Sequence, residues 1–174
     1  MTHDGSNVRL NGILDWVYQE ELYGRGNFTG HWWSPDGRYL AYLQIDQSQV
    51  PEYLIVNGDG VSQTIERTRY PKAGQPMASV AVRVIDIDAG NDRQIDLGDW
   101  PANDRLIGRV SWSPQNQLVL QVLNRVQNRQ ELLVIDPETS QRQSLLIEQT
   151  DGFLEIRGTP EFLSNGDFLW LSDL

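Results

Sequence analysis

The sequence predicts an all-β protein assembled from repeated four-stranded blades, and three observations support this prediction. Short runs rich in Val, Ile, Leu and Tyr alternate with turn residues along most of the chain, as expected for strands. Two sequence motifs recur at a spacing of about fifty residues, the size expected for one blade of a β-propeller. No amphipathic stretch of helical period is long enough to indicate an α/β fold.

Composition argues against several classes of function. The chain has 174 residues and a net charge of −10, which repels phosphate backbones and argues against nucleic acid as a partner. It contains no Cys and two His, His3 and His31, so we expect neither a metal site nor a disulfide, and no cofactor. No apolar run approaches the roughly 18 residues of a membrane span, and residues 1–10 are polar, unlike a secretory signal.

Four runs bounded by Gly, Pro, Asn or Asp are the strongest strand candidates. They are residues 38–45, 80–87, 117–123 and 131–135. Several of them carry apolar residues at consecutive positions, without strict alternation. This pattern indicates sheets that are covered on both faces, as when one sheet stacks on the next.

Two internal repeats run through these strands. WWSPDGRYLAYL, from Trp32, recurs as SWSPQNQLVLQV from Ser111 and, in degraded form, as FLSNGDFLWLS from Phe162. VIDIDAGNDRQIDL, from Val84, recurs as VIDPETSQRQSLLI from Val134. Both repeats are typical of a strand, a tight polar turn and a returning strand.

The spacing of the repeats gives the size of the unit. Asp86 and Asp136 are 50 residues apart, and Ser113 and Ser164 are 51 residues apart. The two markers therefore agree on a unit of about fifty residues, as expected for a four-stranded blade. The chain holds about three such units, so we expect a fragment of a larger propeller.

One interval is longer than the others. Ser34 and Ser113 are 79 residues apart. We assign the excess to an insertion around residues 47–74, which has its own strand candidate at residues 53–56. Both serines lie in turn motifs, and we interpret them as structural turn residues rather than nucleophiles.

Five segments give the chain a resemblance to a known family. In chain order they are DWVYQEELYGRGNF (residues 15–28), WWSPDGRYLAYLQID (32–46), VPEY (50–53), RYPKAG (69–74) and RVQN (125–128). WSPDG alone is common among propellers, but together with DWVY-x-EE and YPKAG it becomes specific. On these residues the chain resembles the propeller domain of the dipeptidyl peptidase IV family, within the prolyl oligopeptidase superfamily of serine peptidases.

The resemblance implies a larger parent enzyme. Members of the family join an eight-bladed propeller to a C-terminal α/β-hydrolase domain, which holds the Ser, Asp and His triad. They release Xaa-Pro or Xaa-Ala dipeptides from free peptide N-termini. We therefore expect a polar lead-in over residues 1–10, a partial propeller over residues 11–174 and no hydrolase domain. The sequence has no G-x-S-x-G elbow, so we expect no catalytic residue here and no activity from this chain alone.

The resemblance also implies partners. These are a peptide substrate with a free N-terminus, the C-terminal hydrolase domain and the remaining blades of the ring; homodimerisation of the parent stays open. Localisation is not readable from the residues themselves, and the family resemblance implies a periplasmic, secreted or membrane-anchored parent.

The resemblance places Glu20 and Glu21 in the substrate site. In the family, the last two acidic residues of this motif bind the terminal ammonium of the peptide, whereas the first acidic position is Gln19 here. An α-amino group has a pKa of about 8, so it is mostly cationic at neutral pH and offers three donors to two carboxylates. An acetylated end would leave both carboxylates without a partner, so the pair selects free amines.

The adjacent glutamates also predict local structure. Neighbouring residues point to opposite faces of a strand but lie about 100° apart in a helical turn. We therefore predict a short helix around residues 16–22 that projects into the cavity of the ring, with Asp15 as its N-cap. Trp16, Tyr18 and Tyr23 are interpreted as packing residues that hold this turn.

Two alternatives stay open. A non-enzymatic propeller that binds partners through its loops would share the fold, because a fold does not fix a function. A member of the same superfamily with acylaminoacyl or oligopeptidase specificity is disfavoured by the Glu20–Glu21 pair, since an endopeptidase has no use for an amine clamp.

Overall fold

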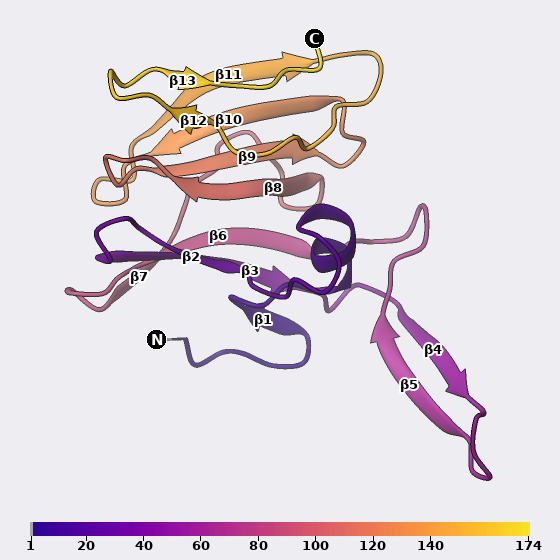
Figure 1. Cartoon of the computed structure of the whole chain (residues 1–174). Helices are drawn as coiled ribbons and strands as arrows, with labels where there is room; N and C mark the ends of the chain where they lie inside the picture. The colour runs from indigo at the N-terminus through magenta and orange to yellow at the C-terminus, as the bar shows by residue number, and fades with distance from the viewer. Residues whose placement is uncertain (1) are drawn as a thin grey trace.

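The computed structural model describes residues 2–174, which form thirteen β-strands and one short helical element. Most strands belong to two antiparallel sheets that stack on one another, and a separate hairpin projects from their side (Figure 1). This arrangement confirms the all-β prediction. Within residues 2–174, none of the helical segments has the length and apolarity needed to cross a membrane.

The first sheet is a four-stranded blade whose edge strand is interrupted. It contains β1 (Arg9–Asn11), β2 (His31–Trp33), β3 (Tyr39–Asp46), β6 (Ser79–Asp86) and β7 (Asn91–Gln94). Both β1 and β2 pair with β3, on two successive stretches of the same side. They therefore act as two halves of one strand, and the blade has the order β1/β2, β3, β6, β7.

The interruption occurs between two glycines. Gly12 donates its N–H to the Leu43 carbonyl at 2.9 Å, and Leu43 donates its N–H to the Gly30 carbonyl at 2.9 Å. A Cβ on Gly30 would lie 3.0 Å from Leu14 Cδ2 and 3.1 Å from the Gly12 carbonyl carbon, so a larger residue would crowd both neighbours. The chain can thus leave the sheet after Gly12 and return at Gly30 without breaking the pairing of β3.

The second sheet is a regular meander. Its strands, in spatial order, are β8 (Arg105–Trp112), β9 (Leu118–Asn124), β10 (Arg129–Ile135) and β11 (Arg142–Gln149). Every position of β9 except Asn124 is buried, which confirms that a run of consecutive apolar residues marks a strand covered on both faces. Two further strands, β12 (Glu161–Phe162) and β13 (Phe168–Leu169), begin a third unit.

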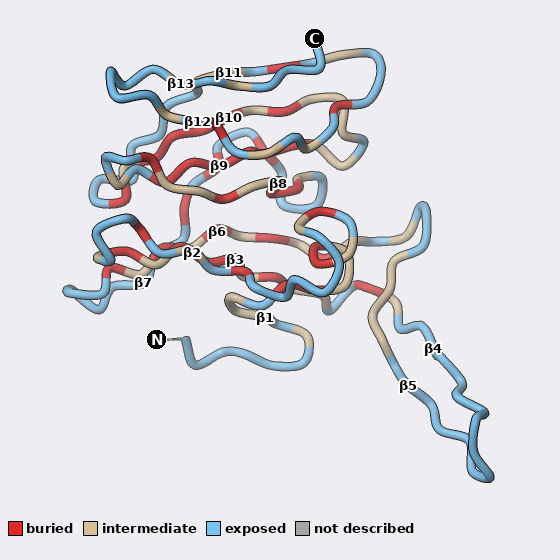
Figure 2. The backbone as a smooth tube through the Cα atoms, viewed as in Figure 1, coloured by how far each residue is buried: buried red, intermediate tan, exposed pale blue. Residues whose placement is uncertain are grey.

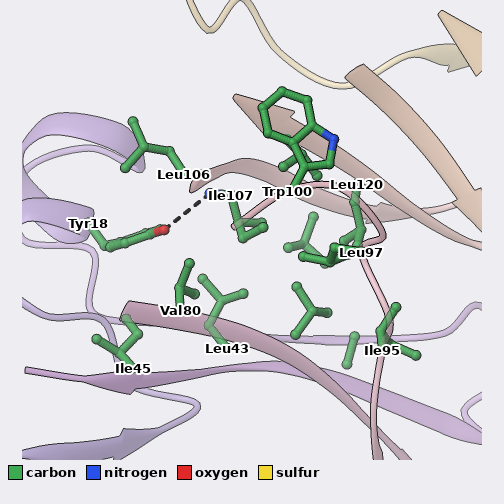
Figure 3. Close-up of a cluster of buried hydrophobic side chains, with 14 of the residues drawn as sticks. Tyr18, Leu43, Ile45, Val80, Ile95, Leu97, Trp100, Leu106, Ile107 and Leu120 are labelled. Carbon is green, nitrogen blue, oxygen red and sulfur yellow. Dashed lines mark hydrogen bonds between the residues drawn. The ribbon is translucent and has the colours of Figure 1, made fainter. Parts of the chain in front are cut away.

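The main hydrophobic core lies between the two sheets. Buried residues concentrate on the facing strands of both blades (Figure 2). In Figure 3, Leu43, Ile45 and Val80 from the first blade point toward Ile107 and Leu120 from the second. The core is therefore shared between blades, as sheet stacking in a propeller requires.

The first repeat corresponds to a turn built on a buried serine. Ser34 Oγ accepts the Tyr39 N–H at 2.9 Å and donates to Asp36 Oδ1 at 2.6 Å. Ser113 Oγ accepts the Gln117 N–H at 3.1 Å in the second copy. Both side chains are thus used within their own turns, which supports the structural interpretation over a nucleophilic one.

The second repeat corresponds to a turn built on an aspartate. Asp86 Oδ1 accepts the backbone N–H groups two and three residues further along the chain, at 3.1 Å each. Asp136 Oδ1 accepts the two equivalent N–H groups at 2.7 and 3.0 Å. The 50-residue spacing therefore reflects the same turn at the same place in two successive blades.

The structure corrects the third marker by one residue. Ser113 makes backbone hydrogen bonds with the third and fourth residues after it, and Leu163 makes the same two bonds. Leu163, and not Ser164, therefore stands at the position of Ser113. The interval becomes 50 residues, in agreement with the spacing of the aspartate turns.

The predicted insertion is a hairpin. It consists of β4 (Glu52–Asn57) and β5 (Thr64–Arg69), which pair with each other and with no other described strand. The hairpin extends away from both sheets and is exposed along most of its length (Figure 2). It accounts for the long interval between Ser34 and Ser113.

Candidate functional site

The loop between Gly12 and Gly30 carries the predicted helical turn. Residues 16 and 17 are α-helical, and η1 (Tyr18–Leu22) continues as a wider π-type turn, in which Tyr23 donates its N–H to the Tyr18 carbonyl at 2.8 Å. This confirms the helix predicted over residues 16–22. Asp15 is its N-cap, because Asp15 Oδ1 accepts the Tyr18 N–H at 3.0 Å.

Two tyrosines fix this turn to the second blade. Tyr18 Oη accepts the Ile107 N–H at 3.1 Å, and Tyr23 Oη donates to the Ile107 carbonyl at 3.2 Å. The Tyr18 contact is the dashed line in Figure 3. Burial raises the pKa of both phenols, so both stay protonated at neutral pH. The packing role predicted for Tyr18 and Tyr23 is confirmed.

Ile107 can make both bonds because of its place in the sheet. It lies on β8, the edge strand of the second blade, where backbone groups have no strand on one side. The pairing of β8 with β9 shifts register between Ile107 and Arg109. Arg109 also donates to the Leu22 carbonyl at 2.6 Å and so holds the end of η1. Sequence analysis missed these β8 residues, because a short apolar strand carries no signal for its edge position.

The other side of the turn rests on the hairpin. The ring of Trp16 meets the ring of Tyr70 edge-on, with centroids 4.4 Å apart. Tyr70 follows β5 directly and donates its N–H to the Pro51 carbonyl at 3.0 Å, which closes the base of the hairpin. The packing role predicted for Trp16 is confirmed, and the helical turn therefore touches both blades and the insertion.

Glu20 and Glu21 lie on the open side of this turn. The buried residues of η1 are Tyr18, Gln19 and Leu22, whereas the side chain of Glu20 is 24% exposed and Glu21 is exposed. Glu20 Oε1 lies 3.3 Å from Arg25 Nε. Of the two predicted site residues, Glu20 is therefore partly buried and paired to a cation, and Glu21 is exposed.

Gln19, the departure from the family motif, has a local structural role. Its side chain is buried, and Gln19 Oε1 accepts the Gly26 N–H at 2.7 Å. An uncharged acceptor suits this position because a buried carboxylate would cost desolvation energy. Gln19 thus supports the loop after η1, and the adjacent glutamates are not needed to accept the Gly26 N–H.

The residues described here offer no metal centre. Among residues 2–174, no group of three or more His, Cys, Asp or Glu side chains is arranged to hold a metal ion.

Curated relatives match part of the chain. Probable dipeptidyl-aminopeptidase B of Talaromyces stipitatus is 39% identical over 101 residues, which is 51% of this chain and 11% of that protein. Probable dipeptidyl-aminopeptidase B of Phaeosphaeria nodorum is 33% identical over 109 residues, 56% of this chain and 12% of that protein. The chain therefore matches only about a tenth of the length of these relatives.

Solved structures match nearly the whole of this chain. Dipeptidyl peptidase 4 of Porphyromonas gingivalis superimposes with a TM-score of 0.84 and 28% identity, over 96% of this chain and 24% of that one. A putative dipeptidyl aminopeptidase IV from Bacteroides ovatus gives a TM-score of 0.78 and 26% identity, over 93% of this chain and 22% of that one. The two stacked sheets, which do not close into a ring, match part of such an N-terminal propeller.

A family model agrees with both comparisons. The model described as "Dipeptidyl peptidase IV (DPP IV) N-terminal region" matches residues 1–173, almost the whole chain. Together with the blade repeats and the acidic helical turn, this match shows that the chain belongs to the dipeptidyl peptidase IV N-terminal region family.

Proposed function

We propose that this chain recognises the free N-terminal amine of a peptide and gates its access, as part of a serine exopeptidase that releases Xaa-Pro or Xaa-Ala dipeptides. The observation that carries the proposal is that Glu20 and Glu21 follow one another on η1 and are both outside its buried set, Tyr18, Gln19 and Leu22. Membership of the family, and relatives named dipeptidyl-aminopeptidases, support the wider assignment to a dipeptidyl peptidase N-terminal domain.

The way the turn is held supports this role. Asp15 caps it, Tyr18 and Tyr23 tie it to Ile107, and Arg109 binds the Leu22 carbonyl. A binding group that is already ordered loses less entropy when the ligand arrives. Two carboxylates on a fixed turn can therefore meet one ammonium with charge-assisted hydrogen bonds and little rearrangement.

The proposal includes an arrangement of domains and partners. We assign residues 1–10 to a lead-in and residues 11–174 to a partial propeller, with the Ser, Asp and His triad outside these residues. The sequence supports this division because it contains no G-x-S-x-G elbow. The partners would be a peptide with a free N-terminus, an α/β-hydrolase domain, the remaining blades and a second copy of the protein.

The test compares reporters on the full-length protein. An Xaa-Pro reporter with a free N-terminus should be cleaved, and the acetylated form should not. Glu20→Gln and Glu21→Gln should each cost about 2–5 kcal/mol in transition-state stabilisation, measured as kcat/KM, if peptide binding excludes water from the site. Glu161→Gln, at an exposed position of β12 far from the acidic turn in sequence, is the matched control and should leave kcat/KM unchanged.

Three results would count against this function. Equal cleavage of the free and acetylated reporters would refute the amine clamp. A loss below about 0.5 kcal/mol in both glutamate variants would indicate solvated carboxylates with no role. No hydrolysis by the full-length protein would favour the non-enzymatic propeller that binds partners through its loops.

A further inference from the structure

Arg25 stands beside the proposed amine site and already occupies one of its carboxylates. Arg25 Nε lies 3.3 Å from Glu20 Oε1, and the Arg25 side chain is 86% exposed. Within residues 2–174, this ion pair is the only polar contact that the structure gives to the Arg25 side chain, and it shows no ion pair for Glu21. The two glutamates are therefore unequal, since Glu20 has a cation as a partner and Glu21 faces solvent.

The loop around Arg25 leaves this side chain free to move. Gly24 and Gly26 flank it, with φ angles of +104° and +81°. A Cβ at either glycine would meet no atom within 4 Å, and the Arg25 side chain between them is mostly exposed. The backbone on both sides is held by hydrogen bonds, because Gly26 donates its N–H to Gln19 Oε1 at 2.7 Å and Tyr23 donates its N–H to the Tyr18 carbonyl at 2.8 Å. The guanidinium can thus leave Glu20 while the turn that carries Glu20 stays in place.

A peptide ammonium can replace Arg25 at Glu20 because it makes stronger contacts there. An ion pair with an exposed partner changes affinity by only about two- to fivefold, because water screens it and a long side chain loses rotamer freedom in forming it. A peptide ammonium offers three donors and can bond to Glu20 and Glu21 at once. A neutral, acetylated terminus brings no positive charge to replace the one that leaves.

We propose that Arg25 is a resident counter-ion of Glu20, which the terminal ammonium of the peptide displaces on binding. This inference rests on the proposed function and adds a residue that sets substrate affinity at the same site. Arg25 competes with the peptide ammonium for Glu20, so it weakens the binding of free-amine peptides by a small amount. Arg25 therefore acts on substrate affinity and does not act on the chemical step.

The test is steady-state kinetics of Arg25→Gln in the full-length protein on a free-amine Xaa-Pro reporter. We expect KM to fall by about two- to fivefold, as the loss of an exposed ion pair allows, while kcat stays unchanged. Arg25→Lys should keep KM close to that of the wild type, because it keeps the charge. Arg9→Gln is the matched control, since Arg9 is also exposed and its Nη1 lies 3.3 Å from Asp4 Oδ2, away from the acidic turn and the hairpin.

The possible results distinguish the counter-ion role of Arg25 from the proposed amine recognition on which it rests. A raised KM in Arg25→Gln would mean that Arg25 binds the peptide directly, and an unchanged KM would mean that the ion pair is incidental. Equal shifts in Arg25→Gln and Arg9→Gln would indicate an effect of net charge alone. Each of these overturns the counter-ion role. The amine site itself fails only if Glu20→Gln and Glu21→Gln leave the preference for free over acetylated reporters unchanged.

Discussion

Asp15 shows at the residue scale how the acidic turn is capped, and how the buried charge of the cap lowers the stability of the fold. Its buried carboxylate accepts the Tyr18 N–H, which caps the helix. Burial raises the pKa of Asp15 above its ordinary value of 3.8, and this outweighs the opposing effect of the hydrogen bond from Tyr18. The folded protein therefore holds this proton more tightly than the unfolded chain does, so the ionised form of Asp15 lowers stability.

We predict that Asp15→Asn is at least as stable as the wild type at pH 7. Asn keeps the capping oxygen and removes the buried charge. The energetic cost of ionised Asp15 is fully present above its raised pKa and disappears as the pH falls from that value toward 3.8. The difference in free energy of unfolding between wild type and Asp15→Asn should therefore shrink over the same range, as urea titrations at several pH values can measure.

The matched variant Asp15→Ala separates the cap from the charge. It removes both, so loss of the cap should cost about 1 kcal/mol relative to Asp15→Asn at every pH. A wild type that is more stable than Asp15→Asn at pH 7 would contradict the assigned direction of the pKa shift.

At the scale of elements, the sequence predicted the helical turn and the inserted hairpin but missed the strands that form only by pairing with a distant strand. The helical turn over residues 16–22 follows from the role that the resemblance gives to two adjacent glutamates, and the insertion within residues 47–74 follows from the long interval between repeats. Both are present. The division of the first edge strand into β1 and β2 could not be predicted. Each half has three residues, and each becomes a strand only by pairing with β3.

The hairpin exposes more apolar side chains than a free surface usually does, which indicates a contact with another part of the protein or with a partner. Every residue of β4 is exposed, including Leu54 and Val56, and Ile65 on β5 pairs opposite Val56. An isolated two-stranded hairpin is only marginally stable in water, and a projecting apolar surface is typical of a contact site. Among the partners proposed above, we assign this surface to a second copy of the protein.

We predict that the double variant Leu54→Lys/Val56→Lys shifts the full-length protein from dimer to monomer. The two charges would have to be buried in the interface, which costs far more than leaving them in water. The molar mass from light scattering checks this. Ile87→Lys, an exposed apolar residue just after β6, is the control and should leave the mass unchanged. A wild type that is already monomeric, or a variant that stays dimeric, would remove the hairpin from the interface.

At the scale of the whole molecule, the fold was predicted from the length of the repeat. Spacings of about fifty residues indicated stacked blades because each blade repeats the same two turns, on Ser34 or Ser113 and on Asp86 or Asp136. The contacts between blades gave no such signal. Trp112 Nε1 donates to the Trp32 carbonyl at 3.1 Å, across 80 positions of sequence, and nothing local marks that pairing.

The two hydrophobic clusters predict which parts of the chain unfold together. One cluster joins both complete blades and includes Leu43 and Ile107. A second, smaller cluster on the far side of the second blade includes Leu132 and packs against Phe162 and Trp170 of the third unit. Residues that share a cluster lose their packing together, so the two blades should form one cooperative unit, with β12 and β13 as a weaker one.

Hydrogen exchange on the 174-residue chain tests this division. Ile107→Ala should destabilise by about 2–5 kcal/mol and lower the protection of β3 and β9 alike, because it leaves a cavity in the core that both blades share. Phe162→Ala should affect β12 and β13 and leave the protection of β3 unchanged, because its contacts lie in the second cluster. If Ile107→Ala lowered protection in the second blade only, the blades would be separate folding units. The helical turn that spans them would then lack a common rigid support.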